Sequence, residues 1–416
     1  MGNAKVEGRH QGDGPATHRQ ADPTTELPVM ADDDAAVEEG VQPGRPLPRT
    51  WLLMGHKAGD NAQLSALAEA LGFPFETRRL AYRRTELVTN LLAGPNLLGV
   101  VPERSDPLEP PWPELVLTAG RRNEPVARWI REQAGGRERV RLVHVGRPWA
   151  PIAEFDLVVT TPQYNLPEAP NVLHNEVPLH RVTAGRLAEA REVWAPRLAH
   201  LPRPYVTVIL GGHSGPYAFD REAGALLGHH VGGMARELGG SLLVTTSART
   251  PVEAVDALEA RLGDVPRELF RWRRDAAENP YFGFLAVADR VVVTGDSMSM
   301  LAEAIATGRP VFVFDLARGP GSRRPERPAD GSVRPRTAGE RVGGFRMQPV
   351  WYRLGQRVGP RQLRRDVGAI HRRQIALGRA SWLGDRAPEP AASEAAPPLR
   401  DTERAVARVR ALFGLA

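Results

Sequence analysis

The stretch VVVTGDSMSMLAEAIATGRPVFVF, residues 291–314, has the pattern of a strand, a loop, a helix and a second strand. Its two ends are short apolar runs typical of buried strands, and its middle carries apolar residues at helical spacing. Strands joined through a helix pair in parallel, so the stretch predicts an α/β fold.

The helix within this stretch opens with hydroxyls instead of a purely apolar turn. At 100° per residue its packing face comprises Met298, Leu301, Ala302 and Ile305. Asp296, Ser299 and Glu303 share the opposite face. A solvated stripe is the ordinary interpretation, but no basic residue follows before Arg309. We favour an anion site at the helix start, with Glu303 placed to accept hydrogen bonds from a ribose.

The same alternation of strands and helices runs through most of the chain. Expected strands of the first half are 50–54, 114–120, 140–146 and 156–162, and those of the second half include 205–212, 241–247 and 267–273. A capping box, Thr250 and Glu253, is expected to start one helix of the second half. The pattern predicts two Rossmann-like doubly wound parallel-sheet domains that face a cleft, with ligands beyond the carboxyl ends of the strands.

Composition suggests where these domains begin and end. Residues 1–48 are polar and rich in Asp, Gly and Pro, which predicts a disordered leader. The N-terminal domain is expected over 49–200 and the C-terminal domain over 201–385. The segment 317–345 is an insertion rich in Arg, Gly and Pro, either a solvated loop or a lid that contacts an anionic ligand or lipid. Residues 386–416 are predicted to form a linker and a last helix.

Composition also excludes several classes of protein. The 416 residues include no cysteine, so thiol chemistry and disulfides are ruled out. No apolar run is long enough to span a bilayer, and the first residues lack the apolar core of a secretory signal. We therefore expect a cytoplasmic protein, with peripheral contact at the inner face of the membrane at most. The net charge of +6 comes from an arginine bias, and no nucleic-acid signature accompanies it, so no nucleic-acid partner is expected.

Two loops of the first half carry candidate side chains. GHKAGDNAQ, residues 55–63, places His56 as a candidate general base beside Lys57, the only lysine after residue 5. Asp60 is a second candidate base, although it is also well placed as a helix N-cap paired with Gln63. In LTAGRRNEP, residues 117–125, Arg121 and Arg122 either bind an anionic acceptor or form a solvated turn before a helix expected over about 124–134.

Two loops of the second half carry the donor candidates. ILGGHSGPYAFD, residues 209–220, supplies a Gly/Ser loop after a strand, a pattern that often presents N–H groups to phosphate. Its candidates are Gly211, Gly212, Ser214 and Gly215. In TTSARTP, residues 245–251, Ser247 and Arg249 lie at another strand end, and Arg249 is suited to a diphosphate.

The order of GGHSG, TTSARTP, NPY and VTGDSMSMLAEAIATGRPV resembles the plant mitochondrial-fission "elongated mitochondria" family and its bacterial glycosyltransferase-like members. GHKAGDNAQ resembles the N-terminal motif of that family. The similarity covers residues 50–316 well and 346–385 weakly. It implies a GT-B-like fold, with a nucleotide-sugar donor in the second domain.

By matched position, the resemblance implies roles for individual residues. The donor diphosphate would be held by Gly212, Ser214, Gly215, Ser297 and Ser299. Glu303 would hold the ribose, and the base would stack near Asn279–Tyr281. His56 or Asp60 would be the catalytic base, and neither a metal nor a tightly bound cofactor would be needed.

The leading expectation is a metal-independent GT-B glycosyltransferase. It would move a sugar from a nucleotide-sugar to a glycan or lipid-linked acceptor of the cell envelope. Two alternatives stay open. One is a non-catalytic adaptor of the mitochondrial-fission type that recruits a dynamin-like partner, and the other is a nucleotide-sugar epimerase on the same fold.

Overall fold

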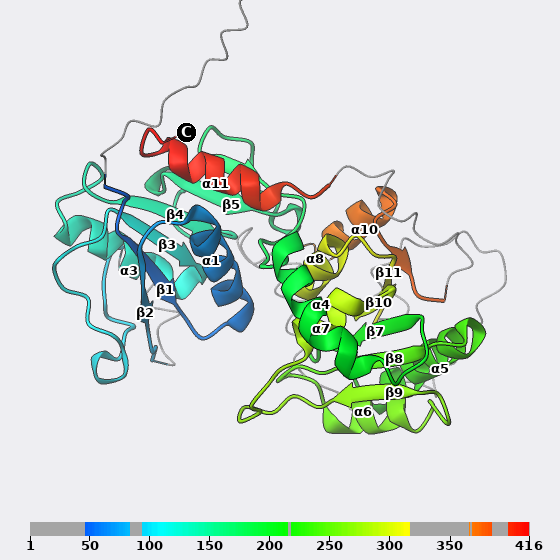
Figure 1. The fold of residues 1–416 in the computed structure, drawn as a ribbon. Coiled ribbons are helices and arrows are strands. Elements are labelled where there is room, and N and C mark those ends of the chain that lie inside the picture. Colours follow the sequence, from blue (N-terminus) through cyan, green and yellow to red (C-terminus); the bar gives the residue numbers. More distant parts are fainter. Residues whose placement is uncertain are drawn as a thin grey trace, which may run out of the picture. The chain divides into compact units, whose positions relative to one another are not determined.

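The computed structural model describes residues 46–83, 94–214, 218–316, 366, 368–384 and 398–415 (Figure 1). Most of the expected leader and the whole insertion 317–345 lie outside the described residues. The strands are β1 (Thr50–Met54), β2 (Phe75–Arg79), β3 (Leu115–Ala119), β4 (Arg141–Val145), β5 (Leu157–Thr160), β6 (Val172–His174), β7 (Tyr205–Ile209), β8 (Ser241–Thr245), β9 (Arg267–Phe270), β10 (Arg290–Thr294), β11 (Val311–Phe314) and β12 (Ser381–Trp382).

The helices alternate with these strands, as the sequence predicts. They are α1 (Ala58–Leu71), α3 (Gly120–Gln133), α4 (Ala184–Leu198), α5 (Arg221–Leu238), α6 (Val252–Glu259), α7 (Tyr281–Val287), α8 (Met298–Ala306), α10 (Ala369–Ala376) and α11 (Asp401–Ala411). Short 3₁₀ turns are η1 (Pro102–Arg104), η2 (Ile152–Glu154) and η3 (Pro162–Tyr164). None of the described helices is both long and apolar enough to cross a membrane.

The strands form two six-stranded sheets, and every described pairing within them is parallel. The first sheet has the order β2-β1-β3-β4-β5-β6 and the second β12-β11-β10-β7-β8-β9. In each sheet, the first strands of the chain are added toward one side, and the later strands are then added on the other side of the first strand. The reversal falls between β1 and β3 in the first sheet and between β7 and β10 in the second. The expected fold class, two Rossmann-like doubly wound sheets, is confirmed.

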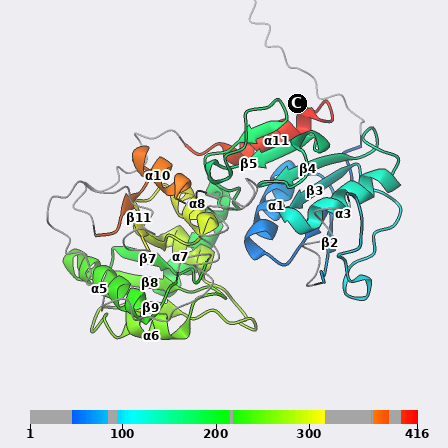
Figure 2. The same cartoon turned by 180° about the vertical axis from the view of Figure 1, so that it is seen from behind.

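Apolar side chains on both faces explain why the strands read as continuous apolar runs. In the first sheet, Leu52 belongs to the core that α1 covers, and Trp51 to the core that α3 covers. Figures 1 and 2 show these two helices from opposite sides. In the second sheet, α5 and α6 cover the face of Val206, while α8 covers the face of Val291. Because both faces of such sheets are covered, the solvent-accessible side chains lie at the sheet edges and in the loops.

The last helix returns to the first sheet. Ala405 and Val409 of α11 are fully buried in the core that α1 helps to form. The Asp401 carboxylate accepts hydrogen bonds from the N–H groups of Glu176 and Val177, at 3.0 and 3.1 Å. The red helix in Figure 1 therefore belongs to the core of the first sheet, although it is last in the chain.

Candidate functional site

At the switch point of the first sheet, the loop after β1 and the start of α3 enclose a small pocket of about 40 Å³, the first-sheet pocket. It is lined by Gly55, His56, Lys57, Asp60, Asn61 and Ala119–Asn123. This is the edge where parallel doubly wound sheets bind ligands. The two first-half loops singled out in the sequence are thus brought together.

Two asparagines hold the loop of this pocket. The Asn61 side chain accepts a hydrogen bond from Gly55 N at 3.0 Å and donates one to Gly55 O at 2.9 Å. Asn123, which is buried, donates to Leu53 O at 2.6 Å. Its amide lies where a Cβ at Gly55 would be crowded, 3.2 Å from Oδ1. The backbone that carries His56 is therefore fixed from both sides.

Asp60 is not the N-cap of α1, so that alternative is wrong. The N-cap is Lys57, and Asp60 lies within the first turn. Its carboxylate is 3.9 Å from the Lys57 ammonium and lies over Gly120, 3.0 Å from where a Cβ would stand. Gly120 has φ +75°, which only glycine adopts without strain. The carboxylate is thereby directed into the pocket rather than used in capping.

His56 lies in a cationic environment. Its Nδ1 is 3.3 Å from the Arg122 guanidinium. Burial lowers the pKa of His56 below 6.5, and the charges of Arg122 and Lys57 lower it further, while Asp60 opposes them. The imidazole is therefore neutral at pH 7, the form a general base requires.

The two arginines lie in a helix and not in a turn. The helix expected over about 124–134 starts earlier, at Gly120, so Arg121 and Arg122 occupy its first turn. The Arg121 guanidinium lies over the Trp149 ring, 5.1 Å from its centroid. The positive dipole end of α3 thus adds to their charge.

At the switch point of the second sheet, three loops are joined by hydrogen bonds into what we call the three-loop site. Gly211 N donates to Thr294 Oγ1 at 2.8 Å, and Gly212 N donates to Asp296 Oδ2 at 2.9 Å. These two N–H groups were expected to face a phosphate. They instead donate to side chains of the protein itself.

Asp296 precedes α8 and does not share a helix face with Ser299 and Glu303. Its side chain is fully buried and makes contacts with all three loops of the three-loop site. Besides Gly212 N, it accepts a hydrogen bond from Thr294 Oγ1 at 2.7 Å and pairs with the Arg249 guanidinium at 3.3 Å. The Arg249 side chain remains 47% exposed. The other terminal nitrogen of the Arg249 guanidinium donates to His213 O at 3.2 Å. Each terminal nitrogen carries a second N–H group, so this exposed guanidinium can still donate to an anion.

The loop after β8 completes the three-loop site. Ser247 Oγ donates to Gly211 O at 3.3 Å, and Thr250 Oγ1 donates to the same carbonyl. The expected capping box is wrong, because the N-cap of α6 is Pro251 and Thr250 is used between loops. Neither Thr250 nor Thr294 was a candidate, since an isolated threonine at a strand end carries no distinctive signal.

Close approach explains the glycines of this site. A Cβ at Gly211 would overlap the Asp296 carboxylate, and one at Gly212 would overlap the Arg249 backbone. The glycine pair is therefore required by the packing of the three loops, whether or not a phosphate binds. Ser214 lies in the described part of this loop, and Gly215 lies outside the described residues.

The remaining donor candidates surround α8. Ser297 is its N-cap and accepts from Met300 N at 3.4 Å, and Ser299 lies in the first turn. Glu303 accepts a hydrogen bond from the Tyr281 hydroxyl. Burial raises the pKa of Glu303 to about 7. Asn279 Oδ1 accepts from Tyr281 N at 3.0 Å, so the NPY segment and Glu303 form one cluster.

The sequence matches a family model described as Mitochondrial fission ELM1 over residues 58–330. The chain belongs to this family. It is 29% identical over 240 residues to the mitochondrial fission protein ELM1 of Arabidopsis thaliana, which covers 52% of this chain and 54% of that protein. The chain thus spans about half the length of this relative. It is also 22% identical over 297 residues to an uncharacterized protein of Rickettsia prowazekii, covering 64% of this chain and 82% of that protein.

Solved structures similar to this ELM1-family chain include two sugar-nucleotide enzymes. A UDP-GlcNAc 2-epimerase of Methanocaldococcus jannaschii in complex with UDP-GlcNAc and UDP has a TM-score of 0.48 and 11% identity, covering 88% of this chain and 99% of that one. An ADP-heptose lipopolysaccharide heptosyltransferase II of E. coli has a TM-score of 0.38 and 13% identity, covering 64% and 84%. The fold assignment itself rests on the strand orders.

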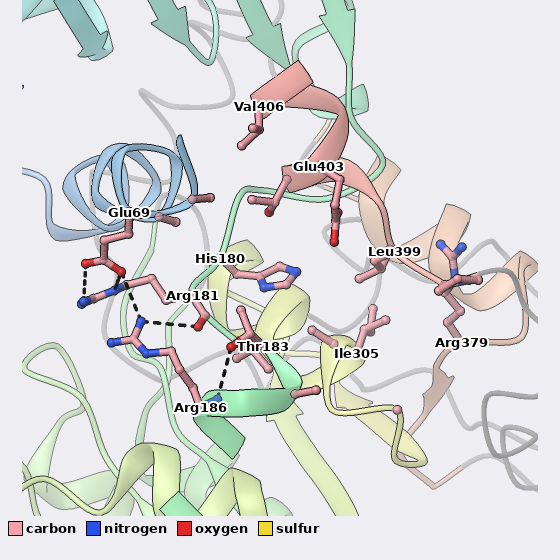
Figure 3. A pocket seen from close by; sticks show the side chains of 18 of the residues that line it. Glu69, His180, Arg181, Thr183, Arg186, Ile305, Arg379, Leu399, Glu403 and Val406 are labelled. Carbon is pink, nitrogen blue, oxygen red and sulfur yellow. Dashed lines mark hydrogen bonds and ion pairs between the residues drawn. The ribbon is translucent and has the colours of Figure 1, made fainter. Parts of the chain in front are cut away.

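The ELM1-family chain also has a larger cavity, of about 760 Å³, away from both switch points (Figure 3). It is lined by the later turns of α1 and α8, by residues 180–184 and by α11. Arg181 and Arg186, at its edge, both pair with Glu69. None of the candidate residues lines it.

Proposed function

We propose that this ELM1-family protein is a cytoplasmic glycosyltransferase that moves a sugar from a nucleotide-sugar to an acceptor of the cell envelope. The observation that carries the proposal is the three-loop site, where Arg249 is anchored on buried Asp296 and left half-exposed at a strand-order switch. Nucleoside diphosphates are anions, and the N–H groups of Arg249 not used by Asp296 and His213 can donate to phosphate oxygens. The similarity of the sequence motifs to the bacterial glycosyltransferase-like members of the family supports the same assignment.

In the proposed reaction, neutral His56 accepts the proton of an acceptor hydroxyl, with Asp60 as the second candidate. The acceptor oxygen then attacks the anomeric carbon of the donor sugar. The bond from that carbon to the diphosphate oxygen breaks, and the nucleoside diphosphate leaves with the bonding electrons. Arg249 stabilises its charge, and Ser297 and Ser299 add hydroxyls at the start of α8. The proposal includes no metal and no tightly bound cofactor.

Arg249→Gln tests this proposal. It should raise the dissociation constant for UDP or ADP about tenfold or more, since a charge-assisted hydrogen bond contributes about 1.5–3 kcal/mol. The measurement is calorimetric titration of the whole chain, supported by thermal shift with a panel of nucleotide-sugars. Arg267→Gln is the matched control, because Arg267 is the first residue of β9 and lies at the amino-terminal ends of the strands, away from the three-loop site. Equal affinity in both variants, or no nucleotide binding by the unaltered protein, contradicts the proposal.

The family description favours a second candidate, a non-catalytic adaptor in organelle fission. An adaptor needs no nucleotide-sugar turnover, so the two functions separate in one assay. Release of nucleoside diphosphate from a donor, dependent on His56, supports transfer. A protein that binds a dynamin-like partner with no such release is an adaptor. Conversion of the donor to its sugar epimer with no acceptor present identifies the third alternative, an epimerase.

A further inference from the structure

We propose that the first-sheet pocket binds a phosphate group carried by the acceptor. The inference rests on the proposed function, because it specifies the acceptor of that transfer. It arises from residues that the donor site does not use. The lining combines Lys57, Arg121 and Arg122 with the single carboxylate of Asp60.

The charges of the pocket match a phosphate better than a carboxylate. Three cations, Lys57, Arg121 and Arg122, face one anion, Asp60, and leave two positive charges in excess. A phosphate monoester carries about −1.5 to −2 at neutral pH, whereas a carboxylate carries one charge. The Lys57 side chain is 57% exposed, so its ammonium can turn toward a ligand. Neutralising both excess charges therefore calls for a phosphate.

The backbone around the pocket also contributes positive partial charge. Helices α1 and α3, each of 14 residues, both begin at its walls. Neither N-cap residue, Lys57 or Ala119, provides a side-chain acceptor for the first turn. The two positive dipole ends add to the three side-chain cations, and α-helix starts of this kind commonly bind phosphate.

The size of the pocket decides which part of a ligand fits. A space of about 40 Å³ admits a group of a few heavy atoms and not a nucleotide-sugar. The donor is thus left to the three-loop site, and the first-sheet pocket receives the phosphate head of a larger acceptor. The rest of the acceptor would extend into solvent or across the sheet edge.

A bound phosphate would also change the candidate base. Its charge offsets Arg122 and Lys57, two of the groups that lower the pKa of His56, and acts in the same direction as Asp60. Arg121, the remaining cation that acts on His56, is offset as well. The pKa of His56 should therefore rise when phosphate binds, which makes the imidazole a stronger base once the acceptor is present.

The test uses inorganic phosphate as the probe, in the Arg249→Gln background so that the three-loop site contributes least. Lys57→Met and Arg122→Gln should each raise the dissociation constant for phosphate about tenfold or more. Arg139→Gln, an exposed arginine just before β4 at the opposite edge of the sheet, should change it less than about twofold. Calorimetry gives the affinities, and NMR of the His56 ring gives its pKa with and without phosphate.

Equal phosphate affinity in all three variants, or a His56 pKa that phosphate does not raise, overturns the inference. The titration of UDP on Lys57→Met keeps this failure separate from that of the proposed function, since nucleotide affinity should be unchanged there. Glycerol 3-phosphate and vesicles containing phosphatidic acid distinguish a soluble from a lipid-borne acceptor. Lys57-dependent binding of either supports the inference, and binding of neither overturns it.

Discussion

At the scale of single residues, the Tyr281–Glu303 pair has the clearest pH dependence. Burial raises the pKa of Glu303 from 4.5 to about 7, partly offset by the hydrogen bond from Tyr281. The folded protein therefore holds this proton more tightly than the unfolded chain. The stabilising contribution of the protonated Glu303 is complete below about pH 4.5 and is lost as the pH rises to about 7, a loss of about 3 kcal/mol at most.

Glu303→Gln should remove this loss, because glutamine is neutral at every pH and its amide oxygen can still accept from Tyr281. The variant should be more stable than the unaltered protein at pH 8 and nearly equal to it at about pH 4.5. Urea unfolding across this range measures the difference. Glu268→Gln, at an exposed position of β9, is the control and should leave the pH profile unchanged. Parallel profiles for Glu303→Gln and the unaltered protein would refute the assignment.

At the scale of elements, helix α5 packs closely on α6, and two glycines of α5 differ sharply in the space available for a side chain. A Cβ at Gly224 would overlap the backbone carbonyl of Ala254, whereas one at Gly233 would meet nothing within 4 Å. Gly224→Ala should destabilise the protein by about 1–3 kcal/mol through overpacking. Gly233→Ala should stabilise it by about 0.5–1 kcal/mol, because alanine favours the helix. Thermal unfolding of the two variants decides, and equal midpoints would contradict this packing.

The elements were largely predictable and the site was only partly so. Apolar runs such as 291–294 identify strands buried on both faces, because burial constrains residue type strongly. Polar loops constrain it weakly. The sequence could suggest that the loops carrying Gly212 and Arg249 lie at one sheet edge, since strand ends imply that. It could not show that Asp296 accepts a hydrogen bond from the Gly212 N–H, because that contact depends on how the three loops fold against each other.

At the scale of the whole molecule, the core of the first sheet is complete only when the last helix, α11, packs against it. The core of the first sheet includes Ala405 and Val409, more than 230 residues after β6 by sequence number. The Asp401 carboxylate, whose pKa burial raises, fastens the start of α11 to the segment that follows β6. The first sheet therefore depends on a helix that comes after the entire second sheet. A chain cut before α11 would leave that apolar face uncovered.

Two alanines on α11 test this dependence. Ala405 is fully buried against the first sheet, and Ala407 on the same helix is exposed. Ala405→Asp places a carboxylate in an apolar core and should destabilise the protein by about 3 kcal/mol or more. Ala407→Asp should change stability by no more than about 0.5 kcal/mol. Hydrogen exchange of β1 and β3 amides, measured with the unfolding midpoint, should show lost protection only in Ala405→Asp. If both variants kept β1 and β3 protected, α11 would be an appendage, and the first sheet would be stable without it.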